Sequence, residues 1–189
     1  MLNHFRAAFT LVVVMTVLTG LAYPLAITGI AQAVMPALAN GSLIDRNGTI
    51  VGSVLIGQNF SADRYFWPRP SATGQDPYNA AASSGSNLGT TSIKLKERVA
   101  ADLARLAGTG IVEPLPADAV TISGSGLDPD ISPAFAEAQI TRVARERGIA
   151  SSAVASLVAQ QTDNPTFGVI GEARVNVLEL NLALDALKP

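Results

Sequence analysis

The side chains that most often do chemistry in enzymes are scarce in this 189-residue sequence. It contains no cysteine, and its single histidine is His4, ahead of a long apolar segment. Ser125 lies between two glycines, but an activated serine needs a base such as histidine, and the longer nucleophile-elbow pattern is not met. Thiol nucleophiles, disulfides and cysteine-type metal sites are therefore excluded, and an outer-surface hydrolase built on Ser125 is disfavoured.

Two carboxylates provide another candidate for chemistry. Asp128 and Asp130 flank a proline and could bind a cation or act as an acid and base pair. They precede Ser132, a good N-cap residue, and negative charge at a helix N-terminus is favoured for electrostatic reasons alone. The run 123–126 lacks the lysine that follows the last glycine of a phosphate loop. We therefore predict no catalytic, cofactor-binding or metal-binding residues, whereas Arg174 could be either a buried ionic anchor or an exposed contact.

The longest uncharged stretch runs from Ala7 to Ile44 and contains a candidate membrane span. A hydrocarbon core about 30 Å thick is crossed by roughly 20 apolar residues in a helix, and residues 7–31 meet this requirement. Arg6 on the short leading end favours a cytoplasmic N-terminus. We predict three parts: a cytoplasmic N-terminus over residues 1–6, a single transmembrane helix over 7–31 and an extracytoplasmic domain over 40–189.

A cleaved secretory signal is the alternative interpretation of the same segment. Two small-x-small sequences, Ala31–Ala33 and Ala37–Ala39, are candidate cleavage sites, and removal there would release a secreted binding module. The apolar region of a signal usually spans about 7–15 residues, whereas this one continues past Gly20 to Ile30. Its length favours an uncut anchor.

The remaining sequence predicts one outer domain of the α+β class. About 145 residues follow Ile44, enough for one domain with its own core. This part is mildly acidic and has no basic run, which argues against nucleic-acid binding. Asn47-Gly48 favours a hairpin turn. The expected helices cover 95–106, 133–147, 153–160 and 177–187, and the expected strands cover 42–44, 49–51, 119–123 and 166–170.

A long irregular segment from Gln58 to Thr91 is rich in proline, glycine and aromatic residues. Such a loop is uncommon in a compact domain unless it is functional or disordered, and its aromatic residues argue against disorder. The rings either pin the loop to the core or contact a partner. Tyrosine, tryptophan and arginine are favoured anchors at interfaces, so we expect Tyr65, Trp67 and Arg69 to lie in a contact surface.

Several motifs in sequential order resemble one known family. They are Tyr23-Pro24-Leu25, Gly52-Ser53, Leu55-Ile56-Gly57-Gln58 with Phe60, Tyr65-Phe66, Arg69-Pro70-Ser71, Ser84-Gly85-Ser86-Asn87-Leu88-Gly89, Ser123-Gly124-Ser125-Gly126-Leu127-Asp128-Pro129 with Ile131-Ser132, and Gly171-Glu172-Ala173-Arg174-Val175-Asn176-Val177-Leu178. Over nearly its whole length the sequence resembles the C subunit of the bacterial potassium-transporting P-type ATPase, the Kdp complex (KdpC family). Ala173 departs from the proline expected there, which affects only a loop.

The resemblance implies a non-catalytic subunit in the bacterial inner (plasma) membrane. Its partners would be the ATP-hydrolysing and potassium-binding subunits of the same pump, together with membrane lipid. The subunit would be needed for assembly and act as a catalytic chaperone that raises the ATP affinity of the ATP-hydrolysing subunit. ATP and potassium would come through the complex, because this chain is expected to bind no cofactor directly.

The topology predicts how such a subunit would work. ATP is cytoplasmic, whereas nearly all polar residues are expected outside, so an effect on ATP would pass through the membrane helix by favouring one state of the pump. The outer domain could also lie over the ion entrance, where acidic groups would modestly enrich cations. We expect partner contacts at Leu18, Leu21, Tyr23, Leu25 and Thr28 in the membrane, and at Tyr65, Trp67, Arg69, Ser86 and Asn87 in the outer domain.

Overall fold

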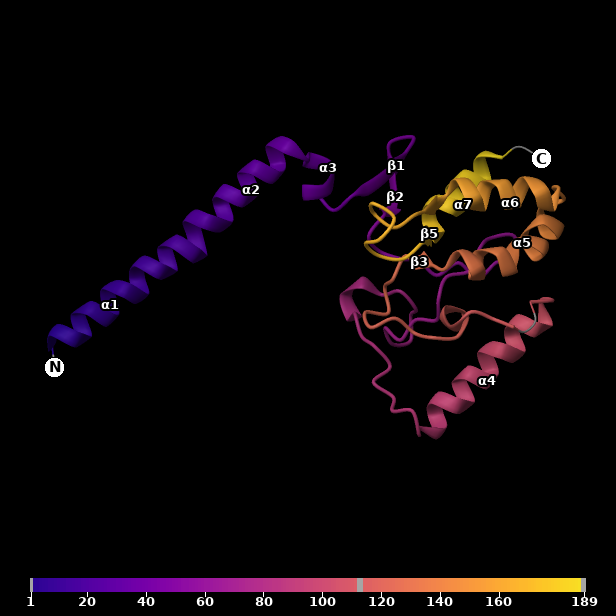
Figure 1. Ribbon diagram of the computed structural model, residues 1–189, viewed down its shortest axis with the longest axis horizontal. Helices are drawn as coiled ribbons and strands as arrows, with labels where there is room; N and C mark the ends of the chain where they lie inside the picture. The colour runs from indigo at the N-terminus through magenta and orange to yellow at the C-terminus, as the bar shows by residue number, and fades with distance from the viewer. Residues whose placement is uncertain (1, 112–113, 188–189) are drawn as a thin grey trace. The chain divides into compact units, whose positions relative to one another are not determined.

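The structure is a computed structural model, and it describes residues 2–111 and 114–187. The chain forms two compact units, Met1–Val51 and Gly52–Pro189. Figure 1 shows the helical N-terminal unit and the mixed C-terminal unit, which are described separately below. The mixture of helices and short strands in the C-terminal unit confirms the predicted α+β class.

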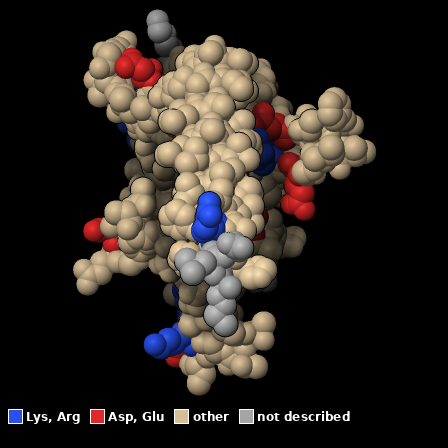
Figure 2. All heavy atoms as spheres, turned by 90° about the vertical axis from the view of Figure 1, so that its left-hand side faces the viewer, with Lys and Arg blue, Asp and Glu red and all other residues tan. Residues whose placement is uncertain are grey.

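The N-terminal unit is dominated by one long apolar helix. It consists of α1 (Leu2–Val17), the π-helical turn η1 (Leu18–Ala22) and α2 (Tyr23–Val34), followed by the short α3 (Pro36–Ala39). Its 31 residues from His4 to Val34 are long and apolar enough to cross a membrane, and its most apolar stretch is not buried by any residue that the structure describes. Figure 2 shows an uncharged surface along this helix, with a basic side chain near its first residues. The predicted apolar helix is confirmed and is slightly longer than expected.

A β-hairpin joins the two units. Strands β1 (Leu43–Arg46) and β2 (Thr49–Ser53) form a two-stranded sheet. Asn47 and Gly48 adopt φ angles of 56° and 80°, as a two-residue turn matching the twist of its strands requires. The amide of Gly48 also donates to the Asp45 carboxylate over 2.8 Å. The hairpin predicted from this residue pair is therefore confirmed.

The C-terminal unit places helices around a small antiparallel sheet. Its strands have the order β3-β5-β4, with Ile131 and Thr162 both opposite Val175 in the central strand. Figure 1 shows α5, α6 and α7 grouped at the sheet, with α4 on the other side of the irregular loops. The elements are η2 (Ala80–Ala82), α4 (Ile93–Gly108), η3 (Ala117–Ala119), β3 (Asp130–Ile131), α5 (Pro133–Arg147), α6 (Ser151–Gln160), β4 (Thr162–Asp163), β5 (Arg174–Asn176) and α7 (Val177–Ala186).

Helix ends follow the capping residues in the sequence. Ser132 caps α5 by accepting from the Phe135 amide over 3.0 Å, and Gly148 ends that helix with a φ of 66°. Asn176 caps α7 in the same way through the Glu179 amide. These caps orient apolar faces toward one core, whose largest buried members include Phe66, Phe135, Leu106, Leu180, Leu184, Val143, Val154 and Val175.

The strand expected over residues 119–123 is wrong. The chain instead forms η3 and then continues as irregular backbone. The carbonyl of Val120 accepts from Arg98 over 2.9 Å, and that of Thr121 accepts from Arg69 over 3.2 Å. Arginine side chains thus bind backbone groups that a strand would pair with its neighbour.

The strand expected over residues 166–170 is also wrong. Thr166 and Ile170 exchange two backbone hydrogen bonds of 2.9 and 3.0 Å, so the segment closes on itself as a tight turn. The true strands, β4 and β5, lie on either side and are only two and three residues long. An alternating pattern needs about four residues to be recognised, which neither strand provides.

Candidate functional site

The irregular segment after β2 is held to the helices by two buried carboxamides. Gln139 on α5 accepts from the Trp67 amide over 2.7 Å and donates to the Trp67 carbonyl over 3.1 Å. Asn181 on α7 makes the same pair of bonds to Phe66, over 2.8 and 3.0 Å. Each side chain therefore satisfies one residue's amide and carbonyl as a neighbouring strand would, and buried backbone groups require such partners.

A buried arginine completes this anchor. Arg142 on α5 donates to the carbonyls of Asp63 and Tyr65 and to the Gln139 side chain. Its guanidinium carbon lies 3.9 Å from the centroid of the Trp67 ring. Burial lowers the pKa of Arg142 to about 10, because the charged form is removed from water. We call these three residues, Gln139, Arg142 and Asn181, the loop anchor.

The anchor was missed by sequence reasoning, although a signal was present. Gln139 and Arg142 continue the three- and four-residue spacing of Phe135 and Val143 on the inner face of α5. Polar residues at core positions of a helix usually bind something buried. Their partner, the backbone of a loop more than 70 residues away, could not be identified from the spacing.

The predicted outer contact residues differ in their exposure. Trp67 is only 5% exposed and belongs to the core, so its ring pins the loop. Tyr65 is partly exposed, with its hydroxyl donating to Asp185 over 3.1 Å and Arg147 lying 4.8 Å from its ring centroid. Contact of these two residues with a partner stays a prediction, and little of Trp67 is available for it.

Arg69 organises a second polar group at the surface. Its guanidinium donates to Asp128 over 2.7 Å, and its carbonyl accepts from the Tyr78 hydroxyl over 2.7 Å. Burial, reinforced by the negative charge of Asp128, raises the pKa of Tyr78 above its ordinary value. Arg69 is therefore a half-buried structural residue whose contact with a partner remains to be tested.

A cleft of about 650 Å³ whose lining includes several charged side chains lies beside Arg69. Arg174 there is exposed, lies 3.2 Å from the Asp130 carboxylate and 3.5 Å from that of Asp163, and is thus an exposed ionic contact. Asp118 accepts from both the amide and the hydroxyl of Ser132. In residues 2–111 and 114–187, no three His, Asp or Glu side chains gather closely enough to hold a metal ion. Asp128 and Asp130 in this cleft are paired with arginines, and Asp118 accepts from the residue that caps α5.

Asp130 provides a testable pH dependence. Burial raises the pKa of its carboxyl above the ordinary value, and this effect exceeds the opposing effect of Arg174. An acid with a higher pKa in the folded state takes up a proton on folding, so its contribution to stability grows as the pH falls through that pKa. The free energy of unfolding of the wild type, relative to that of Asp130→Asn, should therefore increase as the pH falls from neutral to about pH 4, which is close to the pKa of an aspartate in an unfolded chain.

This shift can be measured by urea unfolding of the full chain in detergent micelles. Glu137→Gln, at an exposed position on α5, serves as the control for removal of a carboxylate. If the relative stability of the wild type stays constant or decreases at low pH, burial is not the dominant influence on the pKa of this carboxyl.

Two glycine- and serine-rich motifs pack against each other. The Ser84 amide and the Ser83 hydroxyl both donate to the Ser125 carbonyl, over 2.9 and 3.0 Å. The Ser125 hydroxyl accepts from the Leu127 amide. Ser125 therefore stabilises a junction between loops. The predicted contact residues of the first motif follow this junction: Ser86 is half-buried and Asn87 is exposed.

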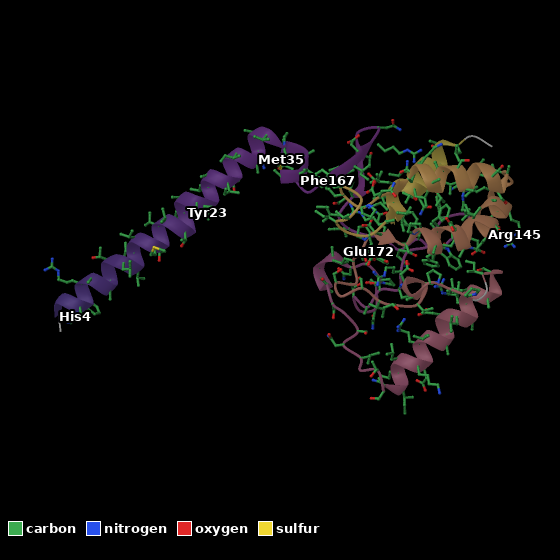
Figure 3. All side chains as sticks on the ribbon, viewed as in Figure 1. His4, Tyr23, Met35, Arg145, Phe167 and Glu172 are labelled. Carbon is green, nitrogen blue, oxygen red and sulfur yellow. The ribbon has the colours of Figure 1, made fainter. Side chains whose placement is uncertain are left out.

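The predicted membrane contact residues are all exposed in the structure. Leu18 and Leu21 lie in η1, whereas Tyr23, Leu25 and Thr28 lie in α2. Figure 3 shows Tyr23 near the middle of the long helix, between His4 and Met35. A π-helical turn rotates less per residue than an α-helix, so residues before and after η1 are displaced around the axis. Contacts at these positions remain predictions.

Comparisons with known proteins give one consistent result. A family model described as KdpC, K+-transporting ATPase, c chain, matches residues 5–186. A potassium-transporting ATPase KdpC subunit of Allorhizobium ampelinum is 56% identical over 186 residues, covering 98% of this chain and 97% of the relative. That of Burkholderia vietnamiensis is 58% identical, covering 96% and 95%. That of Polaromonas naphthalenivorans is 57% identical, covering 100% and 97%.

These matches span both the apolar helix and the α+β unit, and the relatives carry the same printed name. The resemblance seen in the sequence motifs is therefore confirmed. This chain belongs to the KdpC family, the c chain of the K+-transporting ATPase, and is an accessory subunit of that potassium pump.

Proposed function

We propose that this chain assembles with the ATP-hydrolysing and potassium-binding subunits of the pump and raises the ATP affinity of the former without binding nucleotide itself. The observation that carries the proposal is the apolar helix from His4 to Val34, which none of the described residues buries. Such a helix satisfies its own backbone hydrogen bonds and can therefore lie in lipid, where it can contact the helices of other membrane subunits. The N-terminus lies in the cytoplasm and the α+β unit outside, in keeping with Arg6 near the N-terminal end of the helix.

The proposed effect on ATP is an allosteric one. The chain binds more tightly to the pump state with high ATP affinity and shifts the population toward it, which requires no contact with nucleotide. Contacts in the membrane are made by the helix around Leu21 and Leu25, and outer contacts include Tyr65 and Arg69, whose side chains are only partly buried. A released, secreted module is not favoured, because the relatives are named as subunits of the pump.

Co-purification tests the assembly. Affinity-tagged full chain, solubilised in mild detergent from membranes that contain the whole pump, should bring with it a P-type ATPase and a multi-span subunit. Intact mass of the recovered chain reports whether its N-terminal segment is still present. Recovery of the chain alone, or trimmed near Ala33 or Ala39, would contradict the proposal.

ATP titrations test the allosteric part. Omitting this chain from the purified pump should raise the KM for ATP by about fivefold or more, the lower end of typical coupling between sites. The full chain by itself should not bind ATP saturably. Saturable binding to the isolated chain, or a KM that does not change when the chain is omitted, would contradict coupling through the membrane.

A further inference from the structure

The turn between β4 and β5 exposes an unusually apolar surface. Phe167 is 90% exposed, Val169 81% and Ile170 63%. Figure 3 shows Phe167 and Glu172 on the side of the C-terminal unit opposite Arg145. Isolated apolar side chains are common on surfaces, but a cluster at one protruding turn marks an interaction site. We call residues 165–171 the apolar turn.

The turn is closed by backbone hydrogen bonds of its own. The amides of Gly168, Val169 and Ile170 all donate within the turn, to the carbonyls of Pro165 or Thr166, over 2.8–3.3 Å. Phe167 has a φ of 55°, in the left-handed region that an aromatic residue rarely adopts. Strained residues of this kind persist where the surroundings impose them, and they cluster at functional positions. Binding through a preformed turn loses little conformational entropy.

The surroundings of the turn identify the kind of partner. Asp163 and Glu172 flank it, and Arg174 is exposed beside Asp163. An apolar centre with a charged rim is the usual organisation of a protein interface. A bilayer with anionic lipids attracts basic flanks, whereas two of these three charges are acidic. The observations therefore favour a protein surface over a lipid surface.

Strand β5 connects the apolar turn to the segment that follows β2. Asn176, at the end of β5, donates to the carbonyl of Val54, two residues after the C-terminal unit begins at Gly52. The apolar turn leads into the other end of β5. The turn and the segment that follows β2 therefore lie at opposite ends of one short strand.

We infer that the apolar turn docks Phe167, Val169 and Ile170 into an apolar pocket with a basic rim on the extracytoplasmic surface of another subunit of the pump. This inference rests on the proposed function, because it requires the chain to assemble with those subunits. It adds the residues and the chemistry of one contact, at a position that the sequence motifs did not indicate.

Site-specific cross-linking tests the contact directly. The photoreactive residue benzoylphenylalanine replaces Phe167 in the full chain within the assembled pump, and Ile93 in a control. Ile93 is 73% exposed and begins α4. We expect position 167, but not position 93, to cross-link to the potassium-binding or ATP-hydrolysing subunit, as identified by mass spectrometry. Cross-links to lipid alone, or equal cross-links from both positions, would overturn the inference.

Paired substitutions give a second measurement. Phe167→Asp with Val169→Asp should lower co-purification of the pump subunits by about tenfold or more, as expected for loss of a hot-spot aromatic, whereas Ile93→Asp should not. An unchanged thermal midpoint of the substituted chain would confirm its fold. If wild-type chain retains the pump subunits and the double variant does so equally, the apolar turn is not the contact. If wild-type chain retains none, the proposed function itself fails.

Discussion

Replacing Arg142 by alanine is expected to lower the free energy of unfolding by about 3–5 kcal/mol, through lost hydrogen bonds and a cavity in the core. Arg142 is 1% exposed, and its guanidinium donates to two loop carbonyls and to Gln139. Alanine would remove the donor to the Asp63 and Tyr65 carbonyls and the packing against Trp67, while the Gln139 oxygen would keep only its bond from the Trp67 amide. The loop from Asp63 to Trp67 should then detach from α5.

Two matched variants separate the causes of this loss. Arg142→Met keeps most of the volume and avoids burying a charge, so it should destabilise less than alanine. Arg145→Ala, on the same helix with an exposed side chain paired to Glu146, should change stability by less than about 0.5 kcal/mol. Equal losses for Arg142→Ala and Arg145→Ala would show that the loop anchor contributes little.

Urea unfolding of the full chain in detergent micelles measures these differences. Trp67 is the only tryptophan of the chain, so its fluorescence reports on the C-terminal unit and not on the apolar helix. Circular dichroism should be recorded in parallel, because the Arg142 variants also change the immediate surroundings of the indole ring.

The second large effect is expected at a glycine. Gly126 has a φ of 68°, and a Cβ there would lie 2.7 Å from the Ser84 carbonyl and 2.8 Å from the Thr73 methyl group. Gly126→Ala should therefore lower the free energy of unfolding by about 2–4 kcal/mol, from backbone strain and overpacking together. The junction between the two glycine- and serine-rich motifs would have to open.

Gly124 provides a control two residues away. A Cβ at Gly124 would meet no heavy atom within 4 Å, and Gly124→Ala should change stability by less than about 0.5 kcal/mol. The same urea titration compares the two variants. A loss at Gly124 as large as that at Gly126 would indicate that general loop flexibility, and not the close approach of Ser84, determines the effect.

Features with strong local causes were predictable from the sequence. The apolar helix follows from its length and lack of charge, the hairpin from Asn47-Gly48, and the α5 boundaries from Ser132 and Gly148. In each case the residue types favour one backbone conformation without help from distant parts of the chain. Family membership was likewise readable from short motifs spread over the whole sequence.

Features that depend on distant partners were not predictable. The expected strand after Asp118 failed because Arg69 and Arg98 bind its backbone from other elements. The loop anchor joins residues more than 70 positions apart, and spacing within one helix cannot identify a partner in a loop. The apolar turn was read as a strand because alternation of side chains looks the same whether a segment pairs with a neighbour or closes on itself.

The ion pairs of the C-terminal unit have a further consequence. Those at Asp128, Asp130, Asp163 and Asp185 all join an arginine to a carboxylate, and no histidine or cysteine occurs after His4. Histidine and cysteine are the side chains that ordinarily change charge near neutral pH. The associations of the unit should therefore respond to ionic strength, which screens exposed charges, more than to small changes of acidity near neutral pH.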